Sequence, residues 1–89
     1  MKLTIRLLPP YSKKGEKNEH VLELPGEVVE LRNLALYLSS EFGELLHYPL
    51  FDKKDLLTAE FMVNGKHQPV GYRLKEGDSV AVIPYICGG

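Results

Sequence analysis

The sequence predicts an α+β fold of two layers, in which a mixed β-sheet packs on one main helix. One segment, residues 28–42, repeats apolar residues at helical spacing. Shorter segments with strand patterns flank it: residues 2–8 and 20–24 before it, and two or three among residues 59–63, 66–70 and 79–83 after it. A chain of 89 residues has room for a single domain, so we expect residues 1–89 to share one core.

The first two strands are predicted to form an opening hairpin. Residues 2–8 place Leu3, Ile5 and Leu7 on one side and polar residues on the other, as a half-buried strand does. Pro9-Pro10 ends this strand. Residues 11–19 are interpreted as a loose polar loop, and residues 20–24 resume the extended pattern.

The helix is predicted over residues 28–42 from an apolar stripe whose members recur every three or four residues: Val28, Leu31, Leu34, Leu38, Phe42 and Leu45. Gly43 is expected to stop it, because glycine readily adopts the left-handed conformation that often follows a helix. Pro49 excludes a continuous regular element between residues 44 and 57, which predicts a meandering connection.

The last strands are predicted from a turn and an apolar run. Asn64-Gly65 is the pair that best supplies the positive φ angles of a tight hairpin, so residues 59–63 and 66–70 are expected to pair. Residues 74–78 form a turn in which Asp78 is expected to bond nearby backbone amides. The apolar run of residues 79–83 favours a strand that is central in the sheet and covered on both faces.

Charge and composition argue against several classes of partner. The net charge is −1 and the pI about 6.3, which gives no positive field for nucleic acid or anionic lipid. Arg6 and the two prolines interrupt the only stretch that resembles an export signal. A lone cysteine, Cys87, fits a reducing compartment. We therefore expect a cytoplasmic protein without nucleic-acid or membrane partners.

The sequence shows no evident catalytic or metal-binding machinery. His20, His47 and His67 are far apart, and a single cysteine cannot provide the ligand pairs of a structural zinc site. No glycine-rich phosphate loop and no Ser-His-Asp spacing is present. The expectation is a protein that is not itself an enzyme and holds no cofactor.

The last five residues carry the chemistry. Pro84 ends the strand pattern, and residues 85–89 are expected to form an extended, flexible tail that ends in Gly88-Gly89. Two residues without side chains can thread a narrow channel and present the α-carboxylate of Gly89. A carboxylate is a poor electrophile, so ATP must first convert it to an acyl-adenylate. A sulfur donor can then displace AMP to leave a thiocarboxylate, or a lysine amine can attack to give a protein conjugate.

The segment from Leu74 to Pro84, read with Ile86 and Gly88-Gly89, resembles the C-terminal signature of the MoaD/ThiS sulfur-carrier family. The Asn64-Gly65 hairpin and the position of the helix agree with that family. The resemblance is closest to the MoaD branch, the small subunit of molybdopterin synthase, because that branch carries a proline shortly before the diglycine. It implies the ubiquitin-like β-grasp fold and a role in molybdenum or tungsten cofactor biosynthesis.

The resemblance also implies partners and roles for residues. Gly89 would be adenylated and thiolated by a ubiquitin-activating-type adenylyltransferase that uses ATP, and would carry AMP or sulfur covalently. Gly88 would line the threading channel. A large synthase subunit of the MoaE type would hold the pterin. Partner contacts would fall on one set of residues: Leu7, Ile83, Pro84, Tyr85, Ile86, Cys87 and Gly88. Leu7 and Ile83 are equally well interpreted as ordinary core or sheet residues.

Two departures from the family pattern bear on the partners. MoaD-like chains often continue the first strand with alanine and Leu-Arg-Glu, whereas this chain has Pro9-Pro10-Tyr11-Ser12-Lys13-Lys14, so its partner contacts are expected to differ. Cys87 replaces a residue that is usually small and inert. It is interpreted either as a small residue tolerated in the tail, or as a thiol that forms a disulfide with the activating enzyme or a transient acyl disulfide with the thiocarboxylate.

Three alternatives remain open from the sequence. The sulfur acceptor could instead be the thiazole of thiamin, a thio-amino acid or a tRNA base. The chain could be a ubiquitin-like protein modifier, joined through Gly89 to lysines. It could also be a passive binding module whose tail has no chemical role.

Overall fold

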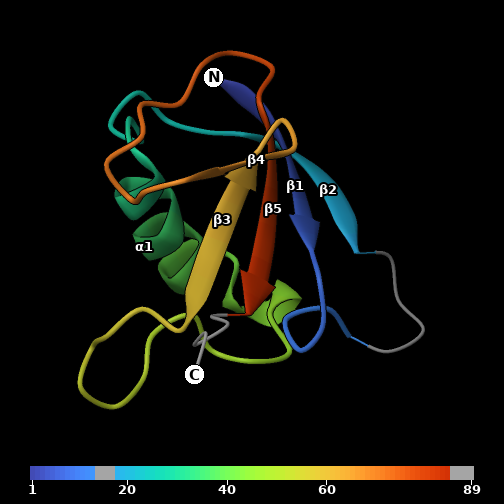
Figure 1. Ribbon diagram of the computed structural model, residues 1–89, viewed down its shortest axis with the longest axis vertical. Coiled ribbons are helices and arrows are strands. Elements are labelled where there is room, and N and C mark those ends of the chain that lie inside the picture. Colours follow the sequence, from blue (N-terminus) through green and yellow to red (C-terminus); the bar gives the residue numbers. More distant parts are fainter. Residues whose placement is uncertain (14–17, 85–89) are drawn as a thin grey trace.

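The computed structural model describes residues 1–13 and 18–84. Its elements in chain order are β1 (Lys2–Leu7), β2 (Glu19–Glu23), α1 (Leu31–Glu41), the 3₁₀ helix η1 (Gly43–Leu45), β3 (Ala59–Val63), β4 (Lys66–Gln68) and β5 (Ser79–Pro84). The described residues form one five-stranded sheet in the order β2-β1-β5-β3-β4. β1 and β5 are parallel and the other pairs antiparallel, and α1 packs across one face (Figure 1). The predicted two-layer fold with a central last strand is confirmed.

The core lies between α1 and one face of the sheet. Alternate side chains of the three middle strands are buried there together with the inner stripe of the helix: Leu3, Ile5, Leu7, Ala59, Phe61, Val63, Val80, Val82, Leu31, Leu34, Ala35 and Leu38. The prediction that β5 is covered on both faces is wrong. Ala81 and Ile83 point to the opposite face and are partly exposed, and no second layer covers that face in the described part of the chain.

The helix begins three residues later than the apolar stripe predicts. Val28 is buried, but it lies in a turn in which its N–H donates to the Pro25 carbonyl at 3.0 Å. The N–H groups of Leu31 and Arg32, which have no partner within a helix, donate to the carbonyls of Tyr72 and Val70 at 3.1 and 2.9 Å. Locally, Asn33 Oδ1 accepts the N–H of Glu30 at 2.9 Å in a capping box, so this box and the distant loop together fix where α1 starts.

The predicted left-handed stop at Gly43 is also wrong. α1 ends at Glu41, and Gly43 opens η1 instead. The N–H of Phe42 donates to the Leu38 carbonyl at 2.9 Å and closes α1. The N–H groups of Leu45 and Leu46 donate to the carbonyls of Phe42 and Gly43 at 3.0 and 3.1 Å, which form the 3₁₀ turn that follows.

The tight hairpin between β3 and β4 is confirmed. Asn64 and Gly65 have φ angles of 52° and 84°, which is the geometry of a two-residue turn with positive φ at both positions. β4 ends at Gln68, two residues before the predicted boundary, because Pro69 has no N–H for the ladder.

Candidate functional site

The candidate site starts where the central strand ends. β5 pairs with a strand on each side. Its Val82 lies opposite Leu7 of β1, and its Pro84 lies opposite Ala59 of β3. The predicted site residues Tyr85, Ile86, Cys87, Gly88 and Gly89 follow Pro84 and lie outside the described residues. The structure thus defines the base from which residues 85–89 leave the sheet.

Tyr11 lies beside this base, and its burial contradicts the prediction of a polar loop. The side chain is 1 % exposed, and its hydroxyl oxygen lies 2.9 Å from Oγ1 of Thr58, the residue before Ala59. The carbonyl of Tyr11 accepts the N–H of His47 at 2.9 Å. Tyr48 packs edge-on against the Tyr11 ring with the ring centroids 6.0 Å apart. Tyr11 therefore joins the turn after β1 to the segment after η1 at the end of the molecule where β5 ends (Figure 1).

The Tyr11 phenol predicts a loss of stability in alkali. Burial raises the pKa of Tyr11 above its usual 10.0, and this outweighs the opposing hydrogen bond with Thr58. Above about pH 10 the unfolded chain loses this proton before the folded chain does. The free energy of unfolding should therefore fall as pH rises through that range, and should fall less steeply in Tyr11→Phe. Urea unfolding from pH 9 to pH 11 measures both slopes, and parallel curves would contradict the assignment.

The sheet face opposite α1 carries a groove of about 260 Å³. Leu8, Met62, Ala81 and Ile83 supply its apolar part, and Arg6 lies at its edge. The Arg6 guanidinium is 3.4 Å from the Glu19 carboxylate, and both side chains are more than half exposed. Such an exposed pair contributes little to stability, so Arg6 can exchange Glu19 for another acidic partner.

The two residues predicted for the apolar docking face lie on opposite faces of the sheet. Leu7 is 2 % exposed and packs in the core, so it has no surface to offer and its assignment to a docking face is corrected. Ile83 lies in the groove on the open face. Pro84 is partly exposed at the strand end. For Ile83 and Pro84 the role in partner binding stays a prediction.

Asp78 anchors the start of β5. Its carboxylate is buried and accepts the N–H of Lys75 at 2.8 Å, the side-chain amide of Asn64 at 2.9 Å and the hydroxyl of Tyr72 at 3.4 Å. Asn64 in turn accepts the N–H of Ser79 at 2.9 Å. The bond to Lys75 confirms the predicted turn. The links to Asn64 and Tyr72 join the hairpin and the loop beside α1 to β5, which gives Asp78 a structural role.

Among residues 1–13 and 18–84, no group of three or more His, Cys, Asp or Glu side chains is placed to hold a metal ion. Within the same residues no helix is both long and apolar enough to cross a bilayer.

One helix on a mixed sheet with this strand order is the ubiquitin-like β-grasp fold, and solved structures share it. SAMP1 from Haloferax volcanii superposes with a TM-score of 0.71 at 16% identity, covering 100% of both chains. The putative molybdopterin converting factor subunit 1 from Pyrococcus furiosus gives 0.67 at 22%, covering 96% of this chain and 98% of that one. A complex of subunits 1 and 2 of the molybdopterin-converting factor from Helicobacter pylori gives a TM-score of 0.58 at 20% identity, covering 100% of this chain and 100% of the matched chain. At these identities the likeness establishes the fold alone.

The family follows from the sequence. The model of the ThiS family matches residues 9–89, nearly the whole chain, and the chain belongs to that family. This confirms the resemblance that the segment from Leu74 to Pro84 and the diglycine indicated. Comparison with curated protein sequences gave no match.

Proposed function

We propose that this protein is a sulfur carrier whose reactive group is the α-carboxylate of Gly89. Membership of the ThiS family is the observation that carries the proposal. The structure supports it through β5, which is central in the sheet and gives residues 85–89 a fixed base at Pro84. A rigid scaffold with a narrow, side-chain-free end suits delivery of that end into the active site of another protein.

The proposed chemistry has two steps. A carboxylate oxygen of Gly89 attacks the α-phosphate of ATP, and pyrophosphate leaves. Sulfide then attacks the acyl carbon, AMP leaves with the original oxygen, and loss of the sulfide proton leaves a thiocarboxylate. A ubiquitin-activating-type adenylyltransferase supplies the ATP site. The chain itself acts as a carrier and not as an enzyme.

We propose a molybdopterin-type pterin as the sulfur acceptor, in the cytoplasmic biosynthesis of the molybdenum or tungsten cofactor. Two structural neighbours are described as subunit 1 of a molybdopterin converting factor, and one of them is in complex with subunit 2. They support a comparable arrangement here, in which this chain is the small subunit and a MoaE-type large subunit holds the pterin. Co-purification of such a subunit with the tagged chain would separate this acceptor from thiamin thiazole, a thio-amino acid or a tRNA base.

A second candidate function is protein modification. The Haloferax volcanii neighbour is described as small archaeal modifier protein 1. The same acyl-adenylate would then react with a lysine amine, and AMP would leave as an isopeptide bond forms. Mass spectrometry of tryptic peptides from the native cell would reveal this function as Gly89 linked to lysines of other proteins.

The carrier function predicts a mass change at Gly89. The purified chain, incubated with the adenylyltransferase from its own cell, ATP and sulfide, should exchange one oxygen for sulfur at its C-terminus. Intact-mass analysis followed by fragmentation locates the exchange, and a reaction without ATP is the control. An unchanged mass with an adenylyltransferase that is active on ATP would contradict the carrier function.

A further inference from the structure

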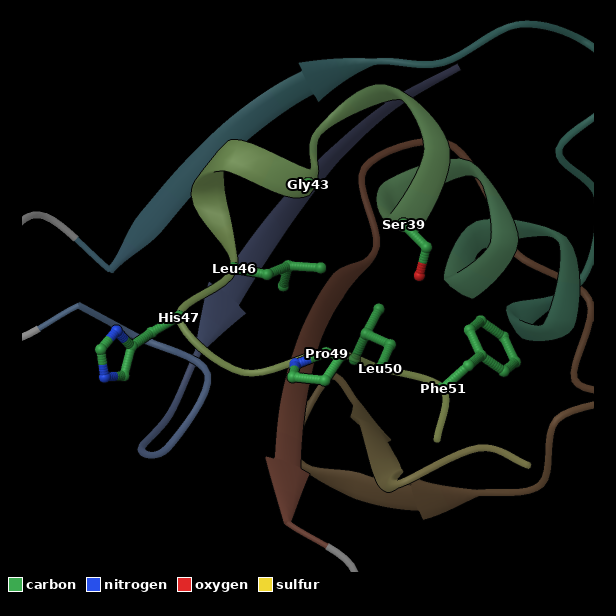
Figure 2. Close-up of a pocket in the computed structure, with 7 residues that line it drawn as sticks. All are labelled: Ser39, Gly43, Leu46, His47, Pro49, Leu50 and Phe51. Carbon is green, nitrogen blue, oxygen red and sulfur yellow. The ribbon is translucent and has the colours of Figure 1, made fainter. Parts of the chain in front are cut away.

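A pocket opens beside the base of the candidate site. Its volume is about 320 Å³, and it lies between the C-terminal end of α1 and the segment that follows η1. Leu46, Pro49, Leu50 and Phe51 give it apolar walls, and Ser39 of α1 lies above them (Figure 2). This volume is at the lower end of the ~300–1,000 Å³ range of small-molecule sites, so the pocket has room for one ring system.

Ser39 gives the pocket a polar feature without a partner. Its hydroxyl oxygen is shielded from solvent and makes no hydrogen bond with the described residues. In Figure 2 the oxygen points away from the helix, towards the space between Leu50 and Phe51. A buried hydroxyl without a partner is unfavourable, so an occupant that supplies one hydrogen bond gains from that bond and from burial of its apolar part.

Backbone contacts join the pocket to the end of β5. The N–H of Thr58 donates to the carbonyl of Leu50 at 2.7 Å, and the next residue, Ala59, pairs with Pro84. The rim is exposed on the same side: His47 and Pro49 are exposed, and Tyr48 is 47 % exposed. The pocket and its rim therefore lie at the end of the molecule from which residues 85–89 leave.

Because the tail is short, this end of the molecule must lie close to any enzyme that acts on Gly89. Five residues, 85–89, span at most about 17 Å when fully extended. An active site that receives the carboxylate of Gly89 inside a channel must therefore have the mouth of that channel close to Pro84. The surface around Pro84, including the pocket, then faces the mouth.

We infer that this pocket receives one aromatic side chain of the activating enzyme, a tyrosine or a tryptophan, whose O–H or N–H bonds to Ser39 after a rotation about χ1 turns the shielded hydroxyl into the pocket. The inference rests on the proposed function. The apolar walls disfavour a charged side chain, the volume suits one ring, and Ser39 requires a hydrogen-bonding end on the occupant. Tyrosine and tryptophan are the side chains that combine these properties and that most often anchor protein interfaces.

A larger side chain at the pocket wall tests the inference. Gly43 lines the pocket, and a Cβ on it meets no atom within 4 Å, so Gly43→Leu adds bulk to this surface without a clash inside the chain. Gly71 has the same open surroundings but lies in the loop beside the start of α1, which makes Gly71→Leu the matched control. In adenylation kinetics with the activating enzyme, Gly43→Leu should raise the KM for this chain about 10-fold and leave kcat unchanged. Gly71→Leu should change KM less than about 2-fold.

Ser39→Ala separates binding from folding. Removal of an unpartnered hydroxyl should raise the unfolding temperature of the free chain while it raises the KM for this chain, whereas a purely structural role would move stability alone. An unchanged KM for Gly43→Leu, or an equal rise in KM for Gly43→Leu and Gly71→Leu, would overturn the inference. Activation of the wild type in the same assay would still uphold the carrier function. No activation of the wild type would overturn both.

The tail itself is the competing occupant. The chain cut after Pro84 should leave the NMR signals of Leu50 and Phe51 unchanged if the pocket awaits a partner. Large shifts of these signals would show that residues 85–89 fill the pocket, and would overturn the assignment to the enzyme.

Discussion

Addition of one alanine after Gly89 should slow thiocarboxylate formation at least about 100-fold. The extension turns the reactive carboxylate of Gly89 into an amide, and it moves the terminal carboxylate about 3.5 Å further along the channel. It also places a methyl group where the proposed mechanism requires a residue without a side chain. The rate is measured by intact mass over time with the activating enzyme, ATP and sulfide.

The control for this prediction is the stability of the extended chain. The added residue lies beyond Pro84 and the pairing that holds the end of β5, so the unfolding temperature should match that of the wild type. If the unfolding temperatures are equal, a lower thiolation rate is due to the changed C-terminus and not to a loss of folding. Full thiolation of the extended chain, at the carboxylate of the added alanine, would refute the requirement for Gly89 as the last residue.

The elements of the fold could be predicted because each depends on residues that are neighbours in sequence. The alternation of Leu3, Ile5 and Leu7 identified the buried face of β1, and Asn64-Gly65 identified the hairpin. The boundaries of α1 could not be predicted in the same way. Besides the local capping box of Glu30 and Asn33, the carbonyls of Tyr72 and Val70 hold its first turn, and they lie about 40 residues further along the chain.

The same distinction applies to the candidate site. The chemistry proposed for Gly89 could be predicted because contiguous residues carry it, although residues 85–89 lie outside the described part of the chain. The surface around Pro84 could not be predicted, because segments distant in sequence form it. For Leu7 the sequence left a core role and a docking role open, and only the structure shows that it faces the core. Tyr11 was placed in a polar loop, although Thr58 and His47 form hydrogen bonds with it from distant segments.

The replacement Asp78→Ala is expected to lower the free energy of unfolding by roughly 3 kcal/mol. Asp78 is 5 % exposed, and its loss leaves the Lys75 N–H, the Asn64 amide and the Tyr72 hydroxyl without their acceptor. These three hydrogen bonds are partly buried around the Asp78 carboxylate, so water replaces them less well than it does in an exposed turn. Equilibrium unfolding in urea measures the change.

Asp52→Ala is the matched control for this loss. The Asp52 carboxylate also accepts backbone N–H groups, those of Lys54 and Leu56 at 2.8 and 3.0 Å, but it lies in an exposed turn. Water can replace it there, so we expect a loss of about 1 kcal/mol. Equal losses for the two variants would show that burial of the Asp78 network contributes nothing.

Asp78→Ala should affect sulfur loading far less than it affects folding. β5 runs for six residues from Ser79 to Pro84, so about 20 Å of strand separates the Asp78 network from the base of the tail. The pairing of Val82 with Leu7 and of Pro84 with Ala59 does not involve Asp78. At a temperature where the variant is still folded, its thiolation rate should therefore stay within about 2-fold of the wild type. A much larger loss would mean that the start of β5 controls how its end is presented.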